Sequence, residues 1–382
     1  MNKKYVALSI ASVMSAFFAM GILDIIGIAT NYVKVDFQLS DTFVGILSFM
    51  LFLSFLLFSV PTGALMNKIG QKKTVMLSIL VMCAALSCLL ISYTLPSVVV
   101  FFLILGVGIT LIQVGLSPLL ANIVSGKSLA SALTFGQFVK ALGSFLIPIL
   151  GAWASFYLGS WRYLFPFLIA YSILSILILH FTPIHEQKVS KSMSMKAAFS
   201  LLGHRVILLS FLSMLCHVGL DVGMNIASPK LMVERVGGSI EVATYANSVY
   251  FLFRTVGCFL GSLVLSKVSH KVFYNVSMLI IILGAAGLFF ADNVYTLYLC
   301  IGLVAIGNSN VYPIIVSRCM LYLPDNKNEV SALMVTGLFG GAIFPLIMGI
   351  ASDAMNTQVG GLIVLSLGIL YMMFWSVRVK EQ

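Results

Sequence analysis

The chain has 382 residues, of which 60% are hydrophobic and only 9% are charged, and its mean hydropathy is +1.08. Soluble domains carry about 25% charged residues. This composition therefore excludes a water-soluble fold and predicts that lipid surrounds most of the chain. A formal charge of +10 also suits nucleic-acid binding. Here the basic residues flank apolar runs in short loops, so we expect a lipid bilayer and no nucleic acid as the partner.

Apolar runs that are long enough to cross a bilayer follow one another along the whole chain. In the first half they cover 6–30, 42–66, 74–93, 96–124, 130–156 and 163–182. In the second half they cover 206–230, 244–268, 272–291, 294–320, 331–352 and 359–377. The first run continues past the length of a secretory signal, which favours an uncleaved helix. We predict an all-α membrane protein with twelve transmembrane helices.

Lys and Arg residues are distributed unevenly between the loops. With the N-terminus placed inside, sixteen of the 22 lie in cytoplasmic segments, four lie outside, and Lys140 and Arg254 fall within spans. This asymmetry predicts cytoplasmic N- and C-termini in a bacterial inner membrane. The longest polar break, 183–205, reads as a cytoplasmic linker. The expected domains are an N-terminal bundle over 1–185, a linker over 186–205 and a C-terminal bundle over 206–382.

The two halves repeat short patterns of glycine and proline. A Gly-x4-Pro pattern with a further Gly recurs in the fifth and eleventh spans, and a proline near the end of the span recurs in the fourth and tenth: Gly143, Pro148 and Gly151 match Gly340, Pro345 and Gly349, and Ser117-Pro118 matches Tyr312-Pro313. Such a repeat predicts two pseudo-symmetric six-helix bundles that are related by an axis along the membrane normal.

The loop after the second span carries a longer motif. Residues 63–73, GALMNKIGQKK, resemble the major facilitator loop motif G-x-L-x-D-(R/K)-x-G-(R/K)-(R/K). Asn67 stands where the motif has an acid, and an Asn side chain is able to cap a helix. The resemblance implies a major facilitator fold and gives Gly63, Asn67, Gly70 and Lys72 a gating or architectural role.

A narrower resemblance, to the fucose permease (fucose–galactose–glucose:proton symporter) group, rests mainly on the second half. Residues 253–261, FRTVGCFLG, resemble its G-R-x-x-G stretch, and residues 310–315, NVYPII, resemble its (F/Y)-P-x-I-F element. Residues 218–223, VGLDVG, resemble its helix-seven motif, with Asp221 in place of Glu. The resemblance implies a sugar:proton symporter in which Arg254 and Pro313 are architectural. It also makes Gln113, Gln137 and Asn310 candidates, because they occupy motif positions.

Four ionisable residues lie deep in the predicted spans: Asp24, Lys140, Asp221 and Arg254. A charge at the bilayer centre costs roughly 2.5 to 3.5 kcal/mol on insertion scales, so each should face water or a partner. The two acids are candidates for substrate binding or proton coupling, with a structural ion pair, such as Asp24 with Lys140, as the alternative. Lys140 has three possible roles: it pairs with Asp24, it binds an anionic group of the substrate, or it carries a proton.

Polar uncharged side chains in the spans form a second group of candidates. His217 precedes Asp221 by four residues and shares its helix face. It serves either in a proton relay with Asp221 or as a helix-lining histidine whose hydrogen bond comes from a neighbouring side chain. Asn225, Asn310, Gln113 and Gln137 suit sugar hydroxyls, although amides also hold membrane helices together.

Signatures of enzymes are absent from the sequence. It has no Walker A, H-E-x-x-H or G-x-S-x-G motif and no C-x-x-C pair. We therefore expect no catalytic residues, no metal site and no cofactor. The six cysteines lie in apolar runs, where they act as small buried residues.

We predict a secondary transporter, monomeric, that moves a small polar solute by alternating access. The preferred substrate is a sugar or sugar derivative, and the preferred coupling ion is the proton. Three alternatives stay open: a carrier of organic anions or acidic sugars with Lys140 and Arg254 as the anion clamp, a drug or metabolite exporter, and a membrane sensor without transport.

Overall fold

The computed structural model describes residues 3–23, 25–39, 41–126, 128–186, 195–237 and 240–378, and nearly all of them are helical. Within these ranges, twelve helical stretches are long and apolar enough to cross a membrane, as predicted. The stretches are Tyr5–Leu23, Gly45–Ile69, Gln71–Ile91, Leu95–Ala121, Ser128–Leu158, Trp161–Phe181, Arg205–Val236, Tyr245–Val264, His270–Phe290, Val294–Tyr322, Pro324–Met355 and Val359–Ser376.

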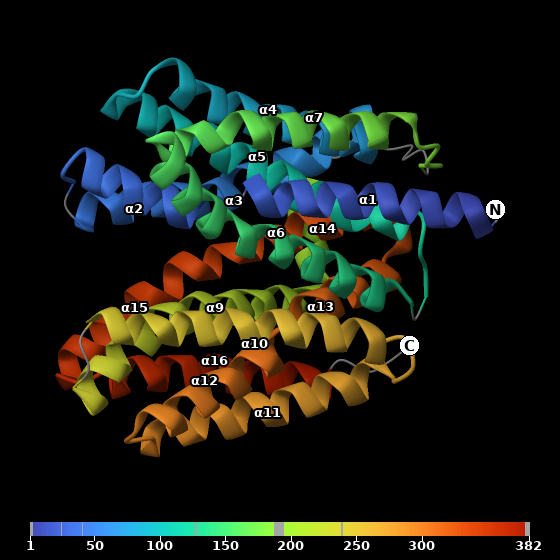
Figure 1. Ribbon diagram of the computed structural model, residues 1–382. Helices are drawn as coiled ribbons and strands as arrows, with labels where there is room; N and C mark the ends of the chain where they lie inside the picture. Colours follow the sequence, from blue (N-terminus) through green and yellow to red (C-terminus); the bar gives the residue numbers. More distant parts are fainter. Residues whose placement is uncertain are drawn as a thin grey trace. The chain divides into compact units, whose positions relative to one another are not determined.

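The α-helices follow the predicted spans closely, and most of their ends lie within a few residues of those expected (Figure 1). Their bounds are α1 Lys3–Leu23, α2 Ile26–Asp36, α3 Asp41–Ile69, α4 Gln71–Ile91, α5 Leu95–Ala121, α6 Ser128–Leu158, α7 Phe165–Phe181, α8 Met195–Ser200, α9 Arg205–Val236, α10 Ile240–Val264, α11 His270–Phe290, α12 Val294–Asn308, α13 Val311–Tyr322, α14 Lys327–Thr336, α15 Gly340–Met355 and α16 Val359–Arg378. Four short 3₁₀ turns complete the described structure: η1 Trp161–Leu164, η2 Leu201–Gly203, η3 Pro324–Asn326 and η4 Gly337–Phe339.

The chain packs as two compact units. The first holds residues 1–125, 136–199 and 324–336, and the second holds 126–135, 200–323 and 337–382. The units follow the two halves of the sequence except that the fifth and eleventh spans are each divided between them. This division occurs at corresponding places in the repeat. The domain boundaries at 185 and 206 stay a prediction, namely that the two halves of the sequence move as rigid bodies.

In each unit one helix packs against at least four others. In the first unit α5 contacts α1, α3, α4 and α14, and from Gly106 to Ala121 nearly every residue of α5 is buried. In the second unit α9 contacts α10, α12, α13, α15 and α16. The helices of each unit run alongside one another (Figure 1).

The glycines of the sequence repeat mark close helix contacts. A Cβ at Gly143 of α6 would lie 2.9 Å from the Ile22 backbone nitrogen in α1. A Cβ at Gly340 of α15 would lie 2.2 Å from the Leu215 carbonyl oxygen in α9. The fifth span thus packs on the first in the way that the eleventh packs on the seventh. Small residues permit this backbone approach in both units.

The repeated prolines leave one backbone carbonyl open in each unit. Proline has no N–H to give to the carbonyl four residues earlier. For Pro118 that carbonyl belongs to Val114, and it accepts a 2.6 Å bond from the Ser331 hydroxyl of α14. The equivalent carbonyl for Pro313 belongs to Ser309, and it receives the Cys258 thiol at 3.4 Å. Neighbouring helices therefore satisfy both groups, as lipid-embedded backbone requires.

The motif loop joins α3 to α4 through a backbone turn that only glycine adopts readily. Gly70 has φ 91° and ψ 160°. Directly after it, the Glu186 carboxylate accepts from the backbone N–H groups of Gln71 at 2.7 Å and Lys72 at 2.9 Å. This anion complements the positive end of α4. The Lys72 ammonium in turn donates to the His180 and Thr182 carbonyls, both at 2.8 Å, at the end of α7.

We expect Gly70→Ala to lower the apparent melting temperature of the detergent-solubilised protein. The added Cβ would lie 2.5 Å from Glu186 Oε2, and the backbone conformation alone costs on the order of 1–3 kcal/mol. Gly126→Ala is the matched control, because Gly126 also has a positive φ of 63° but open space at its Cβ position. Equal melting temperatures for the two variants would contradict a specific role for the Gly70–Glu186 contact.

Candidate functional site

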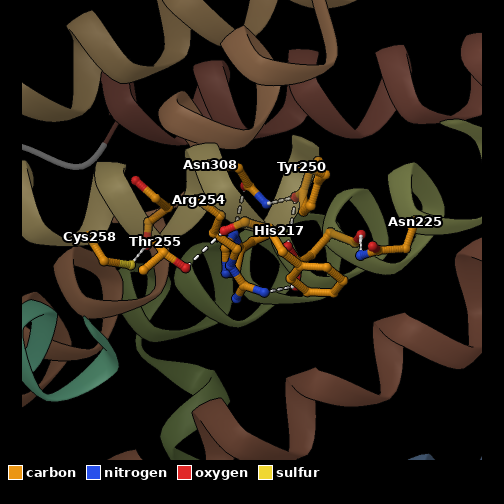
Figure 2. A network of polar contacts seen from close by, with 10 residues as sticks. His217, Asn225, Tyr250, Arg254, Thr255, Cys258 and Asn308 are labelled. Carbon is orange, nitrogen blue, oxygen red and sulfur yellow. Dashed lines mark hydrogen bonds and ion pairs between the residues drawn. The ribbon is translucent and has the colours of Figure 1, made fainter. Parts of the chain in front are cut away.

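A polar stripe runs along the buried face of α9 in the second unit. His217, Asp221 and Asn225 recur at intervals of four residues, which places their side chains on one side of the helix. Helix α10 packs against this face, and α12 packs against both helices. Figure 2 shows the three helices contributing side chains to one network of polar contacts.

Asp221 and Arg254 form an ion pair at the centre of this network. Arg254 Nη1 lies 2.8 Å from Asp221 Oδ2, and the Tyr250 hydroxyl donates to Asp221 Oδ1 at 2.7 Å. The Asp221 side chain is 14% exposed and that of Arg254 is 32% exposed. Each carboxylate oxygen thus has a donor, and the two opposite charges cancel within the spanning region. Arg254, which the resemblance made architectural, contacts the predicted carboxylate directly.

His217 contacts Asn308 of α12, and in the described part of the chain it makes no direct hydrogen bond to Asp221. Its Nδ1 lies 2.8 Å from Asn308 Oδ1. The Asn308 amide reaches the Tyr250 hydroxyl at 3.4 Å, and Tyr250 bonds to Asp221. Asn308 and Tyr250 thus form a chain that links His217 to Asp221, and a proton relay between His217 and Asp221 stays a prediction. His217 is 3% exposed, so this chain is its contact with the rest of the network.

The tenth span is interrupted beside the network. Helix α12 ends at Asn308 and α13 begins at Val311. Asn310, in the break, donates to the Gly257 carbonyl at 2.9 Å and to the Ser309 hydroxyl at 2.7 Å. Discontinuous helices form the binding sites of many secondary transporters. Through Gly257, the predicted Asn310 thus contacts α10, the helix that carries Arg254, and Pro313 follows in α13.

Asn225 closes the other end of the network. Its amide nitrogen donates to the Asp221 backbone carbonyl at 2.8 Å, one turn earlier in α9. The contacts thus bring His217, Asp221 and Asn225 together and add Arg254. Tyr250 and Asn308 complete the network. Tyr250 was not foreseen because a tyrosine in an apolar span resembles a lipid-facing aromatic; its spacing of four residues before Arg254 is the signal that places both on one face.

The candidates of the first half lie in the first unit. Asp24 lies outside the described residues; the flanking helices end at Leu23 and begin at Ile26. Gln113 is buried in α5, whereas Gln137 and Lys140 are half-buried on α6. A Cβ at Gly21 would lie 2.1 Å from the Lys140 carbonyl oxygen, so the α6 backbone at Lys140 contacts α1 one turn before position 24. The proposed Asp24–Lys140 pair remains a prediction.

The first unit also holds a chain of amides that ends on a carboxylate. Asn122 donates to Gln71, Gln71 to Asn328 at 2.7 Å, Asn328 to Asn67 at 2.5 Å, and Asn67 to Glu329 Oε1 at 2.7 Å. Glu329 is only 6% exposed, and its Oε2 has no hydrogen-bond partner among the described residues. The acid that the loop motif lacks at Asn67 is thus supplied by Glu329, from the start of α14. Gly63 lies within α3, one turn before Asn67.

Nothing in the sequence around Glu329 distinguishes it from an ordinary acid at the start of a helix. An acid near the start of a helix is normally solvated and favoured by the helix dipole. Here α14 packs against α3 and α5, which buries the side chain. Among the described residues, no group of three or more His, Cys, Asp or Glu side chains is arranged to hold a metal ion.

The model of the Major Facilitator Superfamily matches residues 10–345 of the sequence. The chain belongs to the Major Facilitator Superfamily. It is therefore a multi-pass membrane transport protein and not an enzyme, and the predicted fold of twelve helices in two pseudo-symmetric bundles is confirmed.

Two curated relatives in this superfamily cover nearly the whole chain. A glucose/galactose transporter of Brucella abortus is 24% identical over 380 residues, which are 93% of this chain and 90% of the relative. A putative glucose/galactose transporter of Helicobacter pylori is 24% identical and covers 100% of this chain and 99% of the relative.

Solved structures of the superfamily superpose over the full length. FucP in the outward conformation gives a TM-score of 0.88 at 17% identity, over 99% of this chain and 100% of FucP. The proton:xylose symporter XylE gives 0.76 at 16% identity, over 100% and 97%. The resemblance to the fucose permease group drawn from the motifs is thus confirmed at the level of the fold.

We expect the Asp221–Arg254 pair to show strong coupling in a double-mutant cycle of thermal stability. Asp221→Asn or Arg254→Gln alone leaves a charge without its counter-ion in the membrane. Such a loss costs about 3–5 kcal/mol for a fully buried pair and less here, because Arg254 is 32% exposed. The double variant should melt above either single variant. Additive losses would contradict the ion pair.

For this superfamily member we also expect the buried carboxylate to tolerate transfer from α14 to the motif loop. Asn67→Asp would set two carboxylates against each other and remove the donor to Glu329 Oε1, so the melting temperature should fall. Adding Glu329→Gln restores one amide and one carboxylate at the same contact and should recover most of the loss. A double variant no more stable than Asn67→Asp would overturn the assigned contact.

Proposed function

We propose that this transporter carries a small neutral sugar across the bacterial inner membrane by alternating access, coupled to protons. One observation carries the substrate class: Asp221 neutralises Arg254 at 2.8 Å within the spanning helices. An arginine already paired with a carboxylate is a poor clamp for an anion, because a second negative group would approach Asp221 as well. A neutral solute rich in hydroxyl groups meets no such repulsion.

The relatives support this choice. The two curated relatives are a glucose/galactose transporter and a putative glucose/galactose transporter. FucP is named as a fucose:proton symporter and XylE as a proton:xylose symporter. A hexose is therefore the first substrate to test. The alternatives of an organic-anion carrier and an exporter have no contact in the described residues that favours them.

Proton coupling is assigned to the carboxylates in the spans. Asp221 has a counter-ion that a proton would release, and Asp24 is the corresponding acid of the first span, with Gln113 and Lys140 as its proposed neighbours. A carrier couples two ligands when each changes the affinity for the other. Protonation of Asp221 would alter its attraction for Arg254 and thus the contact between α9 and α10 that surrounds the substrate.

The movement is assigned to two bodies, the N-terminal bundle over 1–185 and the C-terminal bundle over 206–382, with the linker between them. The Asn67–Glu329 contact lies within the first compact unit but joins residues of the two sequence halves. If the halves move as bodies, this contact has to open and form again in each cycle. We place the contact, with both termini, on the cytoplasmic side, as the Lys and Arg distribution predicts. A monomer suffices for this cycle.

Uptake into proteoliposomes tests the proposal. With an inward proton gradient, labelled glucose or galactose should accumulate above its external concentration, and a protonophore should abolish the accumulation. Glucuronate is the matched anion, since it keeps the ring and replaces one hydroxymethyl group by a carboxylate; it should neither accumulate nor compete. Accumulation of glucuronate without hexose uptake would contradict the neutral-sugar assignment, and hexose accumulation that the protonophore leaves unchanged would contradict proton coupling.

A further inference from the structure

Three amide oxygens of the second unit are buried and have no hydrogen-bond donor among the described residues: Asn225 Oδ1 on α9, Asn247 Oδ1 on α10 and Asn310 Oδ1 in the break between α12 and α13. The first two belong to the two helices that carry the ion pair. Amides in membrane-embedded helices need partners. Tyr250 and Arg254, on the same helix as Asn247, both bond to Asp221.

The two oxygens lie at the same level of the α9–α10 hairpin. Consecutive helices joined by a short connection run antiparallel, and Tyr250 of α10 is opposite Asp221 of α9. Asn225 follows Asp221 by one turn, and Asn247 precedes Tyr250 by one turn. In an antiparallel pair both steps lead toward the connection. The amides therefore flank one level of the hairpin, directly beside the ion pair.

The orientation of Asn225 leaves its oxygen as the open group. The amide nitrogen donates to the Asp221 carbonyl at 2.8 Å, which no oxygen in that position could do. The group at this end of the network is thus an acceptor. Asn247 presents the same kind of atom from the opposite helix. Together they require donors and repel carboxylates.

We propose that Asn225 Oδ1 and Asn247 Oδ1 form a hydroxyl-accepting subsite for the transported sugar. The assignment rests on the proposed function. A sugar hydroxyl is neutral and donates one hydrogen bond, which supplies what each amide lacks without adding charge next to Asp221. The subsite makes Asn247, which no motif marks, a determinant of which hydroxyl the transporter recognises.

Binding of monodeoxy hexoses to the purified protein tests the subsite. The wild type should bind at least one monodeoxy analogue about 2- to 10-fold more weakly than its parent hexose, as expected for one lost neutral hydrogen bond. Asn247→Leu and Asn225→Leu should each weaken the parent by a similar factor. In the variant that lacks the matching acceptor, parent and analogue should bind equally.

If the leucine variants fold poorly, the analogue series can be repeated with Asn247→Ala. The test then compares parent hexose and deoxy analogue on the same variant, and this ratio of affinities does not depend on the stability of the variant. Asn275→Leu is the matched control: the Asn275 oxygen accepts from Ser376 in another part of the unit. It should lower the melting temperature and leave hexose affinity unchanged.

The outcomes separate the two proposals. The subsite is overturned if the wild type binds hexose and both variants still bind the deoxy analogue more weakly than its parent by the wild-type factor. The proposed function then stands. Stabilisation of the wild type by sodium ions that both variants lose, with hexose affinity unaltered, also overturns it, since the oxygens then hold a cation. No hexose binding to the wild type overturns the proposed function itself.

Discussion

The second unit is organised by the need to keep two opposite charges paired inside a membrane. An ionised group at the bilayer centre costs roughly 2.5 to 3.5 kcal/mol on insertion scales, and a residue that stays charged there needs a counter-ion and hydrogen bonds. Asp221 has both, from Arg254 and Tyr250. Because these contacts join α9 to α10, and Asn308 joins α12 to Tyr250, the ion pair fixes which faces of three helices meet and leaves a site without net charge.

Elsewhere the same requirement is met by neighbouring helices rather than by water. The carbonyls that Pro118 and Pro313 leave open receive a side chain from another span in each unit, and the amide chain of the first unit ends on Glu329. Such contacts are individually worth about 0.5–1.5 kcal/mol. They are strong enough to order a resting state and weak enough to exchange during a transport cycle. Hydrophobic packing alone is not directional and would not select these contacts.

The spans were predictable because lipid imposes one rule on every segment: about 20 apolar residues with internal hydrogen bonding. The charged candidates followed from the same rule, which singled out Asp221 and Arg254 without showing that they pair. Pairing depends on which helices meet, and this is a property of tertiary structure. Tyr250 and Asn308 were missed as partners for that reason, and Glu329 was missed because only packing against α3 and α5 distinguishes it from a solvated helix-terminal acid.

Infrared difference spectroscopy of the sugar-free protein in lipid at neutral pH tests the charge state of Asp221 most directly. Subtracting the Asp221→Asn spectrum from that of the wild type isolates the signal of this one carboxyl group. Pairing with Arg254 predicts the bands of an ionised carboxylate. A carbonyl band of a protonated carboxylic acid would show that Asp221 does not balance the charge of Arg254, and would contradict both the neutral site and the choice of a neutral substrate.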